Sequence, residues 1–117
     1  MEWLNLHTST LDSPEFIGSE PTTRATWLCM LRYCIGQENG GRIDDCRSWG
    51  DRRWQQQLRI SKDEAEADSM LWSWDGDSIV VAFYPAQSQA LVQVRRTSGR
   101  NGGLARTDVK ADRKSVV

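Results

Sequence analysis

The chain has 117 residues, of which 38% are hydrophobic and 26% charged, and its formal net charge is −1. This length predicts one domain with a single modest core, and the composition is typical of a soluble globular protein. No apolar run approaches the roughly 18–20 residues of a membrane span, and the N-terminus has neither the basic nor the apolar region of a signal peptide. A cytoplasmic protein that does not engage a membrane is therefore expected.

The net charge hides an asymmetry along the chain. Residues 1–94 hold 8 Lys/Arg and 14 Asp/Glu, a balance of −6, and residues 95–117 hold 7 Lys/Arg and 2 Asp, a balance of +5. This division predicts a folded acidic module over residues 1–94. A basic, glycine-rich and flexible tail or linker that seeks polyanions then follows over residues 95–111.

The first predicted helix, residues 21–36, reads PTTRATWLCMLRYCIG. Pro21 suits the first helical position, where its missing N–H costs nothing. The helix should end before Asn39, Gly40 and Gly41, which tolerate the positive φ of a tight turn. Apolar residues at a spacing of three to four predict a buried face made of Ala25, Trp27, Leu28, Leu31, Cys34 and Ile35.

A short strand and a helical turn are predicted next. Residues 41–43, GRI, are long enough for one bridging strand. Asp44 or Asp45 could then cap a helical turn that runs as far as Trp49.

Two short helices follow this turn. Asp51 is expected to cap a helix over residues 52–59, in which Trp54 and Leu58 lie on one face. A capping box, in which Ser61 and Glu64 each cover the other's backbone N–H, should open a second helix over residues 62–69.

The period changes to that of strands over residues 71–84. The pair Asp75-Gly76 predicts a β-hairpin with a type I′ turn, and Pro85 should end the second strand. Residues 86–96 predict a final helix, in which Ala90, Leu91 and Val94 form a weak apolar stripe.

The predicted order of helix, short strand, two helices and β-hairpin indicates an α+β protein of the winged helix-turn-helix type. Residues 44–60 would form the first half of the helix-turn-helix, residues 62–69 the recognition helix, and residues 74–77 the tip of the wing. Trp49 and Trp54 are expected mainly in the core rather than stacked on nucleobases.

Several of these motifs also resemble a known family. WLCMLRYC in the first helix, the NGG turn, LWSWDGD with its strand, and the basic tail are similar to the winged-helix N-terminal modules of bacteriophage and prophage replication proteins, of the replisome-organiser type. The resemblance extends over roughly residues 3–100. It implies DNA replication initiation in a bacterial host cell, with a further domain that engages a helicase or its loader.

The last residues, 112–117, read DRKSVV and are similar to the translation of a short-read sequencing adapter. We therefore expect residues 112–117 to be an artefact. The natural chain should then continue beyond Ala111, so that the module is truncated here.

No catalytic centre is expected from the residue types. His7 is the single histidine, and no spacing supports a Ser/His or Cys/His arrangement. Residues 63–68 hold four carboxylates, but they lack the alternation of a calcium-binding loop and are more typical of a solvated helix face. The protein is therefore predicted not to be an enzyme and to use no cofactor.

A metal site is not expected either. The three cysteines, Cys29, Cys34 and Cys46, are odd in number and form no CxxC pair. Buried or half-buried thiols in a reducing compartment are the simpler interpretation.

The candidate DNA contacts are basic residues in two groups. The predicted recognition helix holds one lysine and four carboxylates, so phosphate contacts would have to come mainly from elsewhere. Arg59 could also face the DNA backbone beside the arginines of the module, with the glutamines at 55–57 as polar neighbours. Four phosphate contacts from the tail would give a slope of about −4 in a plot of the logarithm of the binding constant against the logarithm of the salt concentration. The two groups are Arg47, Arg52, Arg53 and Lys62 in the module, and Arg95, Arg96, Arg100 and Arg106 in the tail.

Different functions remain open at this point. The helix arginines could instead form surface pairs with Asp44, Asp45 and Asp51. The leading hypothesis is a non-catalytic DNA-binding module of a phage-type replication initiation protein. The alternatives are a protein-interaction module that docks a replication partner, such as a helicase or loader, and a small transcriptional regulator.

Overall fold

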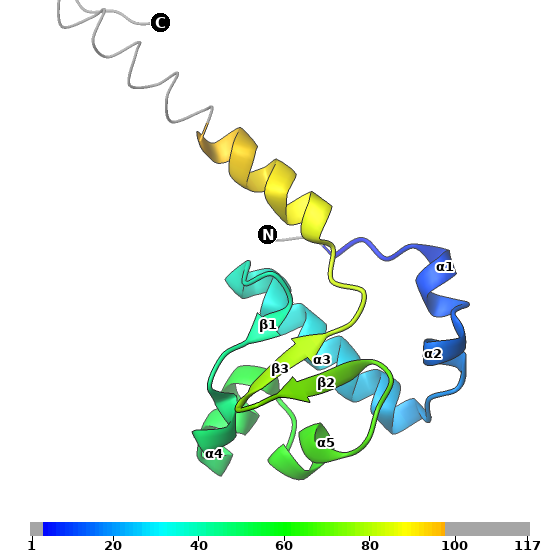
Figure 1. Ribbon diagram of the computed structural model, residues 1–117, viewed down its shortest axis with the longest axis vertical. Coiled ribbons are helices and arrows are strands. Elements are labelled where there is room, and N and C mark those ends of the chain that lie inside the picture. Colours follow the sequence, from blue (N-terminus) through cyan, green and yellow to red (C-terminus); the bar gives the residue numbers. More distant parts are fainter. Residues whose placement is uncertain (1–3, 98–117) are drawn as a thin grey trace, which may run out of the picture. The chain divides into compact units, whose positions relative to one another are not determined.

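The computed structural model describes residues 4–97 (Figure 1). Two units divide the chain, Met1–Ala86 and Gln87–Val117. The predicted boundary after residue 94 falls inside the second unit. Most of the predicted tail, together with residues 112–117, lies outside the described residues.

Two short helices open the described part of the first unit, α1 (Thr8–Leu11) and α2 (Pro14–Ile17). Ser13 is the N-cap of α2: its hydroxyl oxygen accepts a hydrogen bond from the backbone N–H of Phe16 at 3.2 Å. Pro14 follows in the first turn, where no N–H is needed. Neither helix is among the predicted elements, although Ser-Pro is a typical helix start.

Helix α3 (Pro21–Gln37) confirms the helix predicted over residues 21–36. The prediction was wrong for Ala25 and Leu28, which are exposed. Thr26 and Met30 are buried in their place, because the stripe that faces the core is rotated around the helix axis. Thr26 can be buried because its hydroxyl donates to the carbonyl of Thr22, at 2.9 Å.

Three antiparallel strands form one sheet, β1 (Arg42–Ile43), β2 (Trp72–Asp75) and β3 (Ser78–Val81). The order across the sheet is β1-β3-β2, so β3 is central. The short strand predicted after α3 therefore pairs with the far strand of the hairpin, across more than thirty residues of sequence: Ile43 lies opposite Ile79.

The predicted hairpin is confirmed, but its second strand ends at Val81 rather than just before Pro85, and its turn differs from the predicted type I′ turn. Asp75 pairs with Ser78, so the two turn residues are Gly76 and Asp77 rather than Asp75 and Gly76. Gly76 has a φ of +64°, whereas Asp77 is not among the described residues with positive φ. A positive φ at the first of the two turn residues alone is the pattern of a type II′ turn.

A helical turn, η1 (Cys46–Ser48), follows β1, but no aspartate side chain caps it. Asp45 occupies the N-cap position with a φ of +53°, and its side chain accepts no capping hydrogen bond. Its backbone N–H instead donates to the hydroxyl of the buried Ser78, at 3.1 Å. The connection is therefore fixed by the hairpin rather than by a local cap.

Helix α4 (Asp51–Arg53) continues directly into the π-helical segment η2 (Trp54–Leu58). The predicted cap was wrong: Gly50 is the N-cap. Asp51 lies in the first turn, where its carboxylate interacts favourably with the helix dipole. Trp54 and Leu58 are both fully buried, as predicted. The segment ends at Arg59, which has a positive φ of 62°.

Helix α5 (Lys62–Glu66) begins with the predicted capping box. The Ser61 hydroxyl accepts from the Glu64 N–H at 3.1 Å, and the Glu64 carboxylate accepts from the Ser61 N–H at 2.8 Å. The helix is shorter than the predicted residues 62–69, because Ala67 is already extended. At about 1.5 Å per residue, α5 is only about 7.5 Å long.

Tryptophans organise the core between α3, the sheet and the short helices. The Trp27 indole N–H donates to the carbonyl of Ala82 at 3.0 Å. Those of Trp72 and Trp74 both donate to the carbonyl of the buried Ala65, at 2.8 and 2.9 Å. The indole N–H of Trp54 has no hydrogen-bond partner within the described part of the chain.

Residues 86–97 are helical, which confirms the final predicted helix. Leu91 and Val94 on this helix are 50% and 59% exposed. Taken with the sheet and the helices before it, the described residues confirm the predicted α+β class. In residues 4–97 no helix combines the length and hydropathy needed to cross a bilayer.

Candidate nucleic-acid interface

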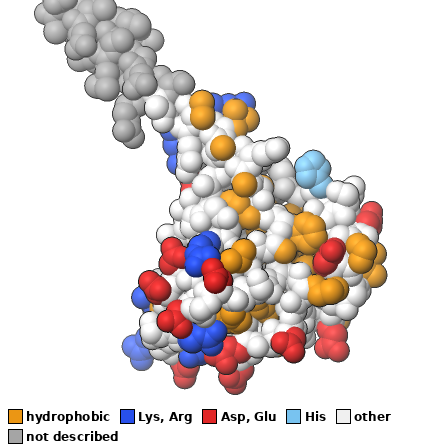
Figure 2. Space-filling view, viewed as in Figure 1, with side chains coloured by type: hydrophobic (Ala, Val, Ile, Leu, Met, Phe, Trp, Pro, Cys, Tyr) orange, Lys and Arg blue, Asp and Glu red, His pale blue; other side chains and the backbone are white. Residues whose placement is uncertain are grey.

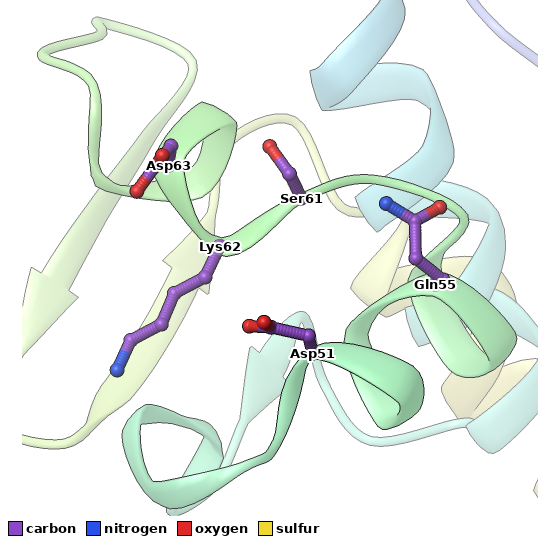
Figure 3. Close-up of a pocket in the computed structure, with 5 residues that line it drawn as sticks. All are labelled: Asp51, Gln55, Ser61, Lys62 and Asp63. Atoms are coloured by element: carbon purple, nitrogen blue, oxygen red, sulfur yellow. The ribbon is translucent and has the colours of Figure 1, made fainter.

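The two helices predicted to form the helix-turn-helix, α4–η2 and α5, border a shallow hollow of about 260 Å³. Figure 3 shows Asp51 and Gln55 reaching it from α4 and η2, and Ser61, Lys62 and Asp63 bordering it from the start of α5. The lining holds two carboxylates and one ammonium group. This corner therefore does not attract a phosphate by itself.

Arg47, the first predicted contact, is bound to the hairpin. Its guanidinium donates twice to the carbonyl of Gly76, at 3.3 and 3.1 Å, and lies 4.0 Å from the centre of the Trp74 ring. Ion pairs with Asp77 at 3.4 Å and Glu66 at 3.9 Å complete its surroundings. Arg47 thus connects η1, the hairpin turn and α5, which makes it a structural residue.

Arg52 and Arg53 are neighbours on α4 but differ in their contacts. Arg53 lies over the ring of Trp49 at 4.1 Å and remains exposed to solvent. Arg52 is exposed and forms no ion pair or side-chain hydrogen bond within residues 4–97. The alternative, in which these arginines pair with Asp44, Asp45 and Asp51, is not found within residues 4–97, and Asp44 binds Arg42 instead.

Lys62, the predicted contact on α5, forms an ion pair with Glu66 one turn later, at 3.8 Å. Asp63 and Glu66 are exposed on the same short helix, and Glu64 belongs to the capping box. The predicted recognition helix is therefore both short and net negative.

One further basic residue lies beside η2, and no sequence pattern predicted this position. Arg32 on α3 donates to the carbonyl of Gln57 at 2.8 Å, a contact between residues 25 apart in the chain. Arg59 is exposed at the end of η2. We refer to the exposed basic and glutamine residues of α4 and η2, with Arg32 and Arg59 beside them, as the α4–η2 surface, which the exposed Asp51 adjoins; its members are Arg32, Arg52, Arg53, Gln55, Gln56, Gln57 and Arg59.

The tail residues divide at the limit of the described part. Arg95 and Arg96 are exposed on the helix of residues 86–97. Arg100 and Arg106 lie outside the described residues.

Charges of both signs alternate over the end of the first unit that carries α4 and α5 (Figure 2). The acidic side chains are as prominent there as the basic ones. An extended surface of one sign, such as a deep phosphate-binding groove would need, is therefore not seen on this face.

The buried thiols offer no reactive group. Burial raises the pKa of the Cys34 thiol to about 12 and that of Cys46 to about 11. Both stay protonated near neutral pH, and a protonated thiol is a poor nucleophile and metal ligand. Cys29 is half-buried, so the interpretation of all three as buried or half-buried free thiols is confirmed. Among residues 4–97 no three His, Cys, Asp or Glu side chains gather into a possible metal site.

Comparison with known proteins adds no further constraint: no protein-family model, no curated protein and no solved structure matches this chain.

Proposed function

We propose that this chain is a non-catalytic DNA-binding module with a winged-helix fold, of the kind found in phage-type replication initiation proteins. It binds the phosphate backbone through the α4–η2 surface and the basic residues from Arg95 onward. Binding of this kind is largely independent of DNA sequence, because contacts to phosphate carry no base information.

The element order supports the winged-helix assignment. After α3 come a single short strand, the helical turn η1, the pair α4–η2 and α5, and then a hairpin with a two-residue turn. β1 pairs with β3, so the hairpin is joined to the segment that precedes the two helices. A wing lies beside a helix-turn-helix in this way. The capping box at Ser61 gives the sharp entry into the second helix.

The charge of the α4–η2 surface is the single observation that carries the proposal. Arg52, Arg53 and Arg59 stand against Asp51 alone over residues 51–59, a balance of +2. Arg52 and Arg59 have no acidic partner in the described structure, and three exposed glutamines lie between them. Guanidinium and amide groups without other partners can donate hydrogen bonds to phosphate oxygens.

The short acidic α5 argues against sequence readout by this helix. It holds Lys62 against Asp63, Glu64 and Glu66, a balance of −2. Bases in the major groove are read by arginine, lysine or amide side chains on a helix long enough to enter the groove. The proposal therefore assigns affinity to phosphate contacts, with a strong dependence on salt.

The test is DNA binding by the full chain, measured as the fluorescence anisotropy of a labelled duplex and a labelled single strand over a salt series. The expected slope becomes less negative by about 0.9 for each phosphate contact removed from duplex binding. Arg52→Gln with Arg59→Gln should therefore change the duplex slope by about 2. The double variant Arg95→Gln with Arg96→Gln gives the contribution of these two arginines to the salt slope in the same way.

Arg42→Gln is the matched control, because it removes one exposed arginine outside the proposed surface. Arg42 is bound to Asp44 at 2.9 Å and to Asp75 at 2.7 Å. If the full chain does not bind DNA at low salt, or if the double variant behaves like Arg42→Gln, the α4–η2 surface is not a DNA interface.

A second candidate is a protein-interaction module in which the winged helix has no DNA contact. The acidic α5 favours it, since Asp63 is exposed and forms no ion pair in residues 4–97. The same salt series separates the two functions, because a module of this kind shows no salt-dependent affinity for DNA.

A further inference from the structure

A groove of about 650 Å³ lies on the first unit, and none of the residues that line it belongs to the α4–η2 surface. Residues 18–20 and Thr23, at the junction of α2 and α3, form one side of it. Residues 67–70, in the loop from α5 to β2, form the other side. These two segments lie about fifty residues apart in the sequence, so only the tertiary fold creates the groove.

Two large apolar side chains are exposed at the groove: Met70 lines it, and Ile17 directly precedes the lining residue Gly18. Ile17 is 59% exposed and Met70 is 58% exposed. The Met70 Cε lies only 3.8 Å from the position that a Cβ on Gly18 would take, so Met70 sits directly beside the end of α2. Two large side chains exposed by more than half, beside a groove, form an apolar surface of the kind that binds a partner.

The segment that holds Phe83 runs beside the one that holds Met70, because the Ala82 N–H donates to the Leu71 carbonyl at 2.9 Å. Phe83 is 38% exposed, and its ring meets Trp27 edge-on at 6.3 Å. Trp27 in turn meets the half-buried Phe16 at 5.7 Å. Phe83 has a φ of +61°, which is rare for a bulky residue. Strained backbone that holds an aromatic ring partly in solvent is typical of a functional position.

The groove is also negatively charged. Glu20 and Asp68 line it, and among the described residues no lysine or arginine does. Neither carboxylate forms an ion pair within residues 4–97. The nearby Arg24 is already engaged, because it donates to the carbonyls of Phe16 and Ile17 at 3.0 and 2.9 Å. Figure 2 shows hydrophobic side chains gathered on the side of the unit that carries α1 and α2, with acidic side chains among them.

We propose that this groove binds a segment of a partner protein in which apolar side chains are flanked by lysine or arginine. The apolar side chains would cover Ile17, Met70 and Phe83, and the cationic ones would pair with Glu20 and Asp68. A second copy of the chain in a symmetric dimer is the weaker occupant, since it would bring the same carboxylates together. The site lies apart from the α4–η2 surface and does not depend on DNA binding.

The test uses a display library of random peptides of about twelve residues, selected against the full chain. The enriched sequences should combine Leu, Phe or Trp with neighbouring Lys or Arg. The best of them, synthesised with a fluorescent label, should bind at least about tenfold more weakly to Met70→Ser and to Asp68→Lys, a change of about 1.4 kcal/mol each.

Two variants outside the groove serve as matched controls. Val80 is 40% exposed on β3, where it lies opposite Arg42 and Ser73, and Asp63 is an exposed acid on α5. Val80→Ser and Asp63→Lys should leave the peptide affinity unchanged. Near-UV circular dichroism of all four variants should match the parent, because every substituted side chain is exposed.

Three results would overturn the proposal. The selection could return no enriched peptide, or peptides whose affinity is the same for Met70→Ser and Asp68→Lys as for the parent. Light scattering could reveal a dimer that Met70→Ser dissociates, which would make a second copy the occupant. DNA affinity, measured in parallel, should be the same for parent and Met70→Ser, so a failure of DNA binding is distinguishable from a failure of the groove.

Discussion

Replacement of Arg47 by alanine should destabilise the fold while it changes DNA affinity less than Arg52→Gln does. Arg47 was a predicted DNA contact, yet its guanidinium binds the hairpin turn and stacks on Trp74. The variant removes a shared hydrogen bond to the Gly76 carbonyl, the stacking contact and two ion pairs at once.

The magnitude follows from these contacts. A net hydrogen bond contributes about 1 kcal/mol, and a cation–π contact at an exposed site about 0.5–1 kcal/mol. The side chain of Arg47 is 40% exposed, so the two ion pairs add little. The sum is about 1.5–2 kcal/mol, which corresponds to a fall in Tm of about 6–16 °C for a domain of this size.

Thermal unfolding followed by tryptophan fluorescence measures this change. Arg52→Ala is the control, because Arg52 is exposed and should alter the free energy of unfolding by less than about 0.5 kcal/mol. Equal Tm values for Arg47→Ala and the parent would refute the structural role of Arg47. A DNA affinity that falls more for Arg47→Ala than for Arg52→Gln would return it to the interface.

Three further predictions concern stability. Ser61→Ala removes one half of the capping box and should lower the free energy of unfolding by about 1 kcal/mol, measured by urea denaturation. Gly41→Ala should cost more than Gly40→Ala: both glycines have positive φ, but only at Gly41 would the new Cβ lie 2.7 Å from the Tyr84 side chain; equal Tm values would contradict this. Burial raises the pKa of Cys34 from 9.0 to about 12, so the folded state keeps a proton that the unfolded chain loses. The Tm should therefore fall as the pH rises from 9 towards 12, and less steeply in Cys34→Ala.

Local signals in the sequence determined most of the elements. The proline start of α3, the Ser61–Glu64 capping box and the glycine of the hairpin turn each act over a few residues, and the structure has all three. Their physics is local because a cap or a turn satisfies backbone groups within one turn of chain. The burial of Trp54 and Leu58 also followed from their spacing of four.

The sequence could not decide what each basic residue does. Arg47 and Arg52 look alike in the chain, but only Arg47 meets a carbonyl and an aromatic ring brought by the hairpin, 29 residues away. Arg32 reaches Gln57 over a similar separation. The groove between residues 18–23 and 67–70 depends in the same way on two segments that the fold brings together. Such contacts follow from the packing of whole elements, since a side chain's partners across the core are set by the tertiary structure and not by its neighbours in sequence.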